Sequence, residues 1–340
     1  MIYNNNKVFL IYFEWSNTKG NHAGMAYLAN KLALDYENVK LIKMISGKSR
    51  YKKALNLFYI WIIAIYLKII TKKDDKVFLM EYLARSCFQD KLARILRFFS
   101  VKGKLVGLVH LAGSHLMEIY HNTDVIKSKM DLLDECVVLG SSLAKFLSEE
   151  VGYINVTTTF HYVDTEYYTP IEKQEEKGNI RILCLGNIKR DFGTLREIVE
   201  SFPDLHFDIC QGVMDLSETF GNCSNVKLYG FIQEDELLRL MQSDDVCLSI
   251  MTDTVGSNVI TTSLATGLVL LVSDVGSIRD YCNPECAFLC KDFNDFKKNL
   301  EILSYNPAIL KTYRQNAINR ASQLSYNEFK KEFEKIFCIG

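Results

Sequence analysis

Short apolar runs alternate with longer segments of helical periodicity, and this alternation limits the possible folds more than any other feature of the sequence. Such a pattern is typical of parallel strands that are buried on both faces and joined by crossover helices. The runs occur at 7–13, 39–44, 76–82, 104–110 and 134–139, and again at 180–186, 205–210, 225–230, 245–250 and 268–273. We therefore predict an α/β protein with two doubly wound, Rossmann-like domains that face each other across a cleft.

A polar stretch at 160–179 separates the two series of runs. We place an N-terminal domain at residues 1–165 and a C-terminal domain at 166–320. The amphipathic segment 321–340 is expected to form a helix that packs back on the first domain. Open α/β sheets bind ligands at the carboxyl ends of their strands, so we expect the active site between the domains, where those strand ends meet.

The charge balance gives no reason to expect nucleic-acid binding, because 40 Lys and Arg residues stand against 41 Asp and Glu residues in 340. The first residues lack the basic region of a signal peptide, and ten cysteines in such a chain are typical of a reducing compartment. We therefore expect a cytoplasmic protein. Cys282, Cys286 and Cys290 lack the paired spacing of zinc sites, so they are interpreted as buried thiols and no metal is expected.

One segment is unusually apolar, with eleven consecutive apolar residues from Leu57 to Leu67 and lysines on both sides. A buried helix of the first domain is one interpretation. Attachment of residues 51–71 to a membrane surface is another, because Trp61, tyrosines and flanking lysines suit the headgroup boundary. A transmembrane helix is the third, although a bilayer requires about 20 apolar residues.

A turn that begins with a glycine follows the first predicted strand of the second domain and precedes a helix. It contains Gly186, Lys189 and Arg190. A helix N-terminus beside cations can bind a phosphate group, through backbone N–H groups, the helix dipole and charge. A solvated cation pair on a loop is the alternative.

A second turn of this kind occurs at "TDTVGSNVITTSLATG", residues 252–267. Gly256 permits close approach of the backbone, and Ser257 or Asn258 can cap the following helix. We expect these three residues to present free backbone N–H groups, so that the two turns together bind a diphosphate. Simple helix capping without a ligand is the alternative.

The first domain offers a glycine loop with Gly20, Asn21 and His22 after its first strand. It lacks the complete G-x-G-x-x-G spacing and an acidic partner for a ribose, which argues against NAD. His110 ends the run 104–110 and is therefore expected at the same sheet edge. A structural histidine is the alternative to a catalytic one.

Three blocks of the second half resemble the retaining GT-B glycosyltransferases of the family 4 type, also called group 1. "HYVDTEYYTP" (161–170) is similar to the interdomain signature of that family, with Tyr162 at a usual glycine. "YGFIQEDELLRLMQSDDVCLSI" (229–250) and "GSNVITTSLATGLVLLVSDVGSIRDY" (256–281) resemble its later blocks, of which the last binds the donor. The first domain matches more loosely, through its glycine loop and His110.

The resemblance implies a metal-independent transferase without a cofactor, whose co-substrate is a nucleoside-diphosphate sugar held in the second domain. It implies a glycan or lipid-linked acceptor in the first domain, near Gly20, Asn21 and His22. His110 falls where the family often has a histidine close to the transferred sugar. The implied donor-binding set also covers the two turns, as Gly186, Lys189, Arg190, Gly256, Ser257, Asn258 and Val259.

Besides Tyr162, the sequence departs from the family at four places. Thr254 and Thr262 stand where two glutamates usually bind the donor sugar and the ribose, and Asn187 and Phe192 occupy the usual places of the basic residues. Threonine can form a hydrogen bond with a hydroxyl group but lacks the charge of a carboxylate. Asp253, one residue from Thr254, is our candidate for the missing acid and, with His110, for a catalytic residue.

The resulting hypothesis is a cytoplasmic hexosyltransferase that builds a bacterial surface polysaccharide or a lipid-linked glycan, peripheral to the inner face of the cell membrane. Two alternatives remain open. The first is a catalytically silent GT-B protein that serves as a binding or scaffold partner. The second is another enzyme of this fold, such as a nucleotide-sugar epimerase or a phosphorylase.

Overall fold

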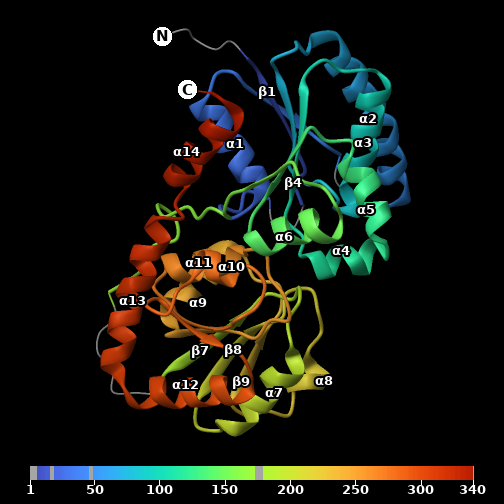
Figure 1. The fold of residues 1–340 in the computed structure, drawn as a ribbon. Helices are drawn as coiled ribbons and strands as arrows, with labels where there is room; N and C mark the ends of the chain where they lie inside the picture. Colours follow the sequence, from blue (N-terminus) through green and yellow to red (C-terminus); the bar gives the residue numbers. More distant parts are fainter. Residues whose placement is uncertain (1–5, 16–18, 46–48, 173–178, 340) are drawn as a thin grey trace. The chain divides into compact units, whose positions relative to one another are not determined.

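The computed structural model describes residues 6–15, 19–45, 49–172 and 179–339, and it divides into two compact units. Unit 1 comprises Met1–Phe160 and Asn327–Gly340, and unit 2 comprises His161–Tyr326 (Figure 1). Within the described residues each unit contains one six-stranded sheet, and all the strand pairings in both sheets are parallel. The predicted α/β class with two doubly wound domains is confirmed.

The sheet of unit 1 has the strand order β2-β1-β3-β4-β5-β6. Every residue of β1 is buried, which explains why this strand reads as a continuous apolar run rather than an alternating one. The strands are β1 Val8–Tyr12, β2 Val39–Lys43, β3 Lys76–Leu79, β4 Lys104–Val109, β5 Glu135–Val138 and β6 Val156–Thr158. The edge strand β6 lies outside the runs from which strands were predicted.

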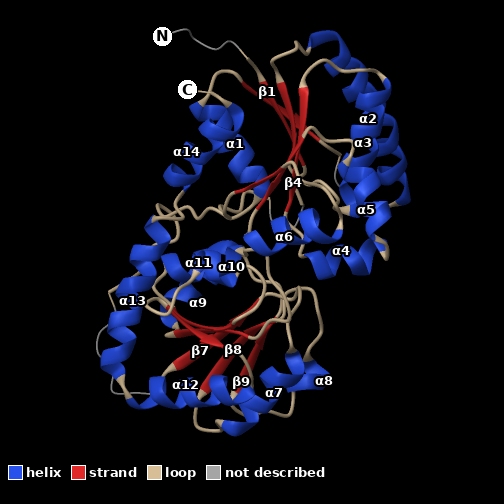
Figure 2. Cartoon of the chain, viewed as in Figure 1, coloured by secondary structure: helices blue, strands red, loops and turns tan. Residues whose placement is uncertain are grey.

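Helices cover both faces of this sheet (Figure 2). They are α1 Met25–Asp35, α2 Arg50–Ile70, the 3₁₀ turn η1 Arg85–Cys87, α3 Gln89–Phe98, α4 Gly113–Tyr120, α5 Thr123–Met130, α6 Ser141–Lys145 and the π-helical turn η2 Phe146–Glu150. The last helix of the chain, α14 Tyr326–Phe337, contributes its residues from Asn327 onward to unit 1. There the ring of Phe337 lies 4.7 Å from that of Phe78 on β3, and 4.4 Å from that of Phe333.

The sheet of unit 2 has the strand order β12-β11-β10-β7-β8-β9. Its strands are β7 Arg181–Leu185, β8 His206–Cys210, β9 Val226–Tyr229, β10 Val246–Ser249, β11 Val269–Ser273 and β12 Ala287–Cys290. Its helices are α7 Phe192–Ser201, α8 Ser217–Phe220, α9 Glu234–Ser243, α10 Asn258–Ala265, α11 Ile278–Tyr281, α12 Phe293–Tyr305 and α13 Pro307–Ser322. Fully buried residues such as Ile198, Phe207 and Leu300 join α7, the sheet and α12 in one core.

The order of the strands reverses between β7 and β10. From β7 the chain proceeds outward through β8 and β9, and then returns to β10 on the opposite side of β7. The loops that follow β7 and β10 therefore leave the sheet in opposite directions at its carboxyl edge. Such a switch point is the usual ligand site of a doubly wound sheet.

Candidate functional site

Main-chain hydrogen bonds tie together the two loops at the switch point of unit 2. The N–H group of Asp191 donates to Ile250 O at 3.0 Å, and that of Thr252 donates to Lys189 O at 2.9 Å. Arg190 and Met251 thus face each other in an antiparallel bridge. The structure therefore brings the two predicted turns, with Lys189 and Arg190 on one and Asp253 on the other, into direct contact.

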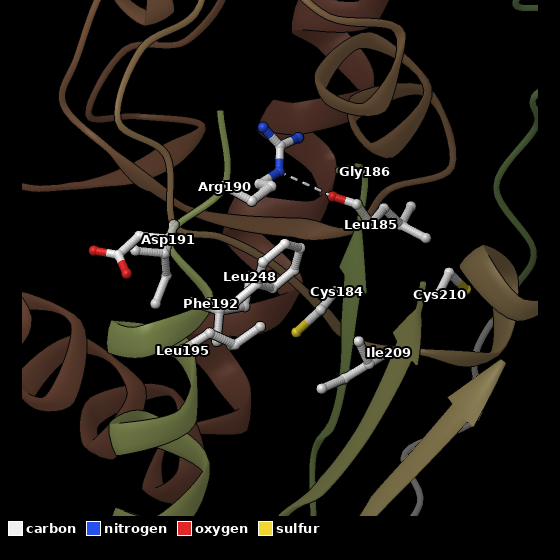
Figure 3. A pocket seen from close by; sticks show the side chains of 11 residues that line it. Cys184, Leu185, Gly186, Arg190, Asp191, Phe192, Leu195, Ile209, Cys210 and Leu248 are labelled. Atoms are coloured by element: carbon white, nitrogen blue, oxygen red, sulfur yellow. Dashed lines mark hydrogen bonds between the residues drawn. The ribbon is translucent and has the colours of Figure 1, made fainter. Parts of the chain in front are cut away.

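Arg190 folds back over the start of its own loop (Figure 3). Its Nε donates to Leu185 O at 3.1 Å, and its Nη1 donates to Ile188 O at 3.2 Å. Gly186 has φ +85°, and a Cβ atom there would lie 2.8 Å from Arg190 Nη2. Glycine at this position therefore provides both the left-handed turn and the space for the guanidinium.

The Arg190 side chain is a half-buried cation without a carboxylate partner. Burial lowers the pKa of its guanidinium, although arginine stays charged in proteins. No Asp or Glu in the described part of the chain forms an ion pair with it, whereas Arg181 in the same unit pairs with Asp208 and Asp244. A charge that is partly removed from water is costly unless it is paired, so this arrangement suits an anionic ligand.

The guanidinium points away from the apolar pocket beneath it, which Phe192, Leu195 and Leu248 help to line (Figure 3). Asp191 also lines this pocket and caps α7, where its carboxylate accepts the N–H of Thr194 at 3.0 Å. The hydrogen bonds from Thr194 lower the pKa of Asp191. The carboxylate beside Arg190 in the sequence is thus used for capping.

Close packing shapes the loop after β10. Gly256 has φ +101°, and a Cβ atom there would lie 2.1 Å from the hydroxyl oxygen of Tyr281. This buried hydroxyl accepts the N–H of His161 at 2.8 Å, so it cannot easily move aside. Gly276 is restricted in the same way, since its Cβ would lie 2.2 Å from Thr254 O. Gly256, in the loop after β10, and Gly276, in the loop after β11, are therefore required by close approach.

The start of α10 offers fewer free donors than the sequence suggested. The N–H of Gly256 donates to Thr254 Oγ1 at 3.3 Å, so the expectation of a free N–H at Gly256 was wrong. The N–H of Val259 is bound by the capping oxygen of Ser257 at 3.2 Å and by Asn258 Oδ1 at 3.0 Å. Ser257 is thus the helix cap, as predicted, and the N–H groups of Ser257 and Asn258 remain for a ligand.

The two threonines at the glutamate positions differ in what they can offer. Thr254 is buried, and its hydroxyl oxygen accepts the bond from Gly256. Thr262 is also buried, and its hydroxyl proton goes to Asn258 O at 2.6 Å, one turn back in the same helix. The Thr262 side chain is therefore left with acceptor capacity only. Asp253 accepts the N–H of Thr254 at 2.8 Å through one carboxylate oxygen.

In unit 1 the structure pairs His110 with a residue that the sequence analysis missed. His110 Nε2 lies 3.1 Å from Glu81 Oε2; His110 directly follows β4, and Glu81 is the second residue after β3. Glu81 is buried, and its main-chain N–H donates to Gln89 Oε1, while Gln89 Nε2 donates to Ile11 O. Glu81 is the last residue but one of the predicted strand 76–82, so its place near the same sheet edge was a usable signal.

Opposing effects act on the His110 imidazole. Burial lowers its pKa, but the charge of Glu81 and the hydrogen bond to it raise the pKa further, so the net shift is upward. The other ring nitrogen, Nδ1, is buried without a hydrogen-bond partner. The Glu81 carboxylate therefore favours the protonated imidazolium and fixes the orientation of the ring.

The glycine loop of unit 1 lies between β1 and α1. Gly20 has φ +84°, and the main-chain N–H of Gly24 donates to Asn21 O at 3.0 Å. The ring of His22 lies 4.6 Å from that of Tyr27 on α1. This loop and His110 follow β1 and β4 at the same edge of the sheet, with the end of β3 and Glu81 between them.

The described residues contain no group of three or more His, Cys, Asp or Glu side chains that could hold a metal ion. Cys282, Cys286 and Cys290 are buried free thiols. Hydrogen bonding from Cys282 lowers the pKa of Cys286 to about 7.

The chain is similar in structure to several glycosyltransferases. The sucrose-phosphate synthase of Thermosynechococcus elongatus matches with a TM-score of 0.77 and 14% identity, over 98% of this chain and 99% of that one. Anabaena HepE, in complex with UDP and glucose, matches with a TM-score of 0.72 and 11% identity, over 98% of this chain and 99% of that one. The lipopolysaccharide outer core galactosyltransferase WaaB matches with a TM-score of 0.69 and 13% identity, over 98% of this chain and 99% of that one. This chain has the GT-B fold.

Residues 185–316 also match the family model of the GftB/GlyA-F C-terminal domain. This match covers both loops of the switch point in unit 2. No curated protein matches the sequence.

Proposed function

We propose that the protein is a glycosyltransferase that moves a sugar from a nucleoside-diphosphate sugar to an acceptor. Arg190 carries this proposal, because it is a half-buried cation without a carboxylate partner at the switch point of a GT-B sheet. The structural neighbours support the donor class, because HepE was solved with UDP and glucose bound and WaaB is a galactosyltransferase.

The donor diphosphate is assigned to the two tied loops. Arg190, Lys189 and the main-chain N–H groups of Ser257 and Asn258 would bind its oxygens. When the glycosidic bond breaks, the electron pair stays on the leaving phosphate oxygen, and these groups stabilise the growing charge without reorganising. Because protein groups supply the positive charge, we infer a metal-independent reaction without a cofactor, in which turnover persists in the presence of a chelator.

Asp253 and Thr254 are assigned to the hydroxyl groups of the donor sugar, and Thr262 can contribute only as an acceptor. In unit 1 we assign His110, held by Glu81, to the transferred sugar, and Gly20, Asn21 and His22 to the acceptor. The resemblance of three sequence blocks to retaining enzymes supports retention of the anomeric configuration. NMR of the product anomer during the first turnovers tests that assignment.

We further propose that the acceptor is a bacterial surface polysaccharide or a lipid-linked glycan, and that the protein works at the inner face of the cell membrane. Helix α2 of unit 1 is long and apolar enough to cross a membrane, and only 28% of its most apolar 18-residue segment is buried. Its remaining apolar side chains support peripheral attachment. Flotation with liposomes tests this attachment independently of turnover.

The deciding experiment measures nucleotide binding and transfer with matched arginine variants. A thermal-shift panel of UDP, GDP and ADP identifies the base, and the corresponding nucleotide sugars are then tested with and without candidate acceptors. Arg190→Gln should lose both binding and turnover, whereas Arg239→Gln, on the exposed face of α9, should retain both. Absence of nucleotide binding in the wild-type protein would refute the proposal.

A catalytically silent binding protein is the second candidate. It is favoured by Thr262, because the hydroxyl that replaces the usual carboxylate is already bonded to its own helix. This candidate predicts nucleotide binding without turnover of any nucleotide sugar. An epimerase would instead consume the donor without an acceptor, which the same assay detects.

A further inference from the structure

Helix α2 has two apolar stripes, and the fold of unit 1 buries only one of them. The buried stripe contains Asn56, Ile60, Ile63, Ala64 and Leu67. The second stripe has the helical spacing i, i+3, i+4, i+7 and i+11 and consists of Phe58, Trp61, Ile62, Ile65 and Ile69. These five side chains are 45–77% exposed. Periodicity of this kind indicates a face that is built to be covered.

The neighbouring helix α3 extends the exposed apolar surface. Phe98, near its end, is 76% exposed, and the adjacent Phe99 lies edge-on to Trp61 at 6.0 Å between ring centroids. The exposed stripe of α2 together with Phe98 is called the apolar face below. Ring contacts from Phe98 through Phe99 to Trp61 connect the two helices at this face.

A groove between α2 and α3 adjoins this face. Ile60 and Trp61 line its apolar side, and Lys91 and Arg94 of α3 line its charged side, together with an ion pair between Asp90 and Lys129. Lys91 lies over the ring of Phe88 at 4.7 Å, and Arg94 is exposed. Neither Lys91 nor Arg94 forms an ion pair with a carboxylate in the described ranges, so the groove has an excess of positive charge.

The charges around α2 identify the kind of molecule that covers it. Residues 50–73 contain no Asp or Glu and carry Arg50, Lys52, Lys53, Lys68, Lys72 and Lys73. A symmetric dimer through this face would bring these cations against their own copies, which is unfavourable. A surface of phosphate groups above hydrocarbon chains matches both the cations and the apolar stripe. Crossing the bilayer would instead require the buried stripe, with Asn56, to leave the core.

We propose that the groove between α2 and α3 is a binding site for the phosphate headgroup of an anionic membrane lipid. The apolar face enters the headgroup region of the leaflet, and Lys91 and Arg94 bind the phosphate of a lipid whose acyl chains lie beside Trp61. This proposal rests on the membrane attachment proposed above and gives it a specific site. It does not depend on transferase activity.

A single-tryptophan variant tests the location of the contact. The chain has two tryptophans, Trp15 and Trp61, so Trp15→Phe leaves Trp61 as the only indole reporter. With vesicles of phosphatidylcholine and phosphatidylglycerol, its emission should shift to the blue and be quenched by brominated acyl chains. An unchanged emission spectrum would overturn the proposal. A shift caused by inorganic phosphate alone, or by raising the protein concentration without vesicles, would also overturn it.

Paired charge variants test the headgroup site. In flotation with the same vesicles, Lys91→Gln/Arg94→Gln should bind about 30-fold more weakly, the effect of two cations next to an anionic surface. Lys72→Gln/Lys73→Gln removes the same charge outside the groove and should lose about 3-fold at most, because salt screens such charges. Equal losses in the two variants would refute a specific site while leaving general attachment intact. All four positions are exposed, so both variants are expected to fold, which thermal unfolding checks.

The turnover assay separates this proposal from the proposed function. The groove variant should retain wild-type turnover with a soluble acceptor. Loss of vesicle binding together with retained turnover supports the lipid site. Vesicle binding by a protein without any turnover leaves the lipid site standing and refutes the transferase.

Discussion

Replacing Arg190 by methionine distinguishes the two roles that this half-buried guanidinium can have, support of the fold or binding of a ligand. In the structure the side chain donates to Leu185 O and Ile188 O and has no carboxylate partner. Methionine retains a similar length and flexibility but removes the charge and both donors. A structural role predicts a large loss of stability, whereas a ligand role predicts a large loss of affinity.

The expected stability change is small because two effects oppose each other. Replacing a buried ionic group by an apolar side chain of similar volume is often neutral or stabilising, by ~1–4 kcal/mol. The carbonyl groups of Leu185 and Ile188 lose a donor in this variant, which costs about 1–3 kcal/mol for each carbonyl that water cannot reach. The hydrogen bond at Ile188 is exposed, so water can replace the donor there. The free energy of unfolding should therefore change by less than about 2 kcal/mol, which corresponds to a Tm change of roughly 4–8 °C at most in a unit of this size.

The affinity change should be much larger. A hydrogen bond to a charged group contributes about 1.5–3 kcal/mol, so the loss of one such bond to a phosphate weakens binding roughly 10- to 150-fold. Calorimetric titration with the preferred nucleoside diphosphate gives Kd, and differential scanning fluorimetry gives Tm, with Arg239→Met as the control. A Tm that falls by more than about 10 °C while Kd is unchanged would show that Arg190 supports the fold.

Four further predictions concern individual contacts. Glu81→Gln should lower the pKa of His110 below its ordinary value, because burial then acts alone. If turnover requires the imidazolium, the decline of kcat/KM at alkaline pH moves to lower pH in this variant. A pH profile of kcat/KM that does not move would contradict this. Gly256→Ala should destabilise the protein by ~1–3 kcal/mol through backbone strain and overpacking, measured as a lower Tm. Thr262→Val should change the donor KM by less than about 3-fold if its hydroxyl proton serves only the helix, and a loss of about 10-fold would assign it to the ribose. Phe337→Ala should cost ~3–5 kcal/mol in urea unfolding, because this ring packs against the first sheet, and a loss below about 1 kcal/mol would show that α14 is dispensable.

The fold was predictable because buried parallel strands leave an unmistakable pattern of apolar runs. The ten predicted runs all contain strands of the structure, whereas the edge strands β6 and β12 were missed. β6 has only three residues, two of them threonine, and an edge strand needs less apolar sequence than a central one. The glycine turns were also visible, because a strand followed by glycine and a helix start is a local pattern.

The details of the site depended on contacts between residues far apart in the sequence. Gly256 is required by the hydroxyl of Tyr281, 25 positions later, and the partner of His110 comes from a different strand end. That Arg190 has no carboxylate partner follows only from the positions of the Asp and Glu side chains in the folded chain. The hydrogen bond between Gly256 and Thr254 depends on local dihedral angles that residue type does not determine. For this reason the expectation of a free N–H group at Gly256 was wrong.

The antiparallel bridge between Arg190 and Met251 has a consequence for the evolution and redesign of this protein. The bridge is formed entirely by main-chain atoms, so it imposes almost no requirement on the side chains of the two loops. Exposed side chains on these loops can therefore be exchanged while the backbone of the two loops keeps its geometry. Libraries restricted to the exposed positions Ile188 and Thr252 should thus yield many folded proteins, and variants with altered ligand selectivity can be sought among them.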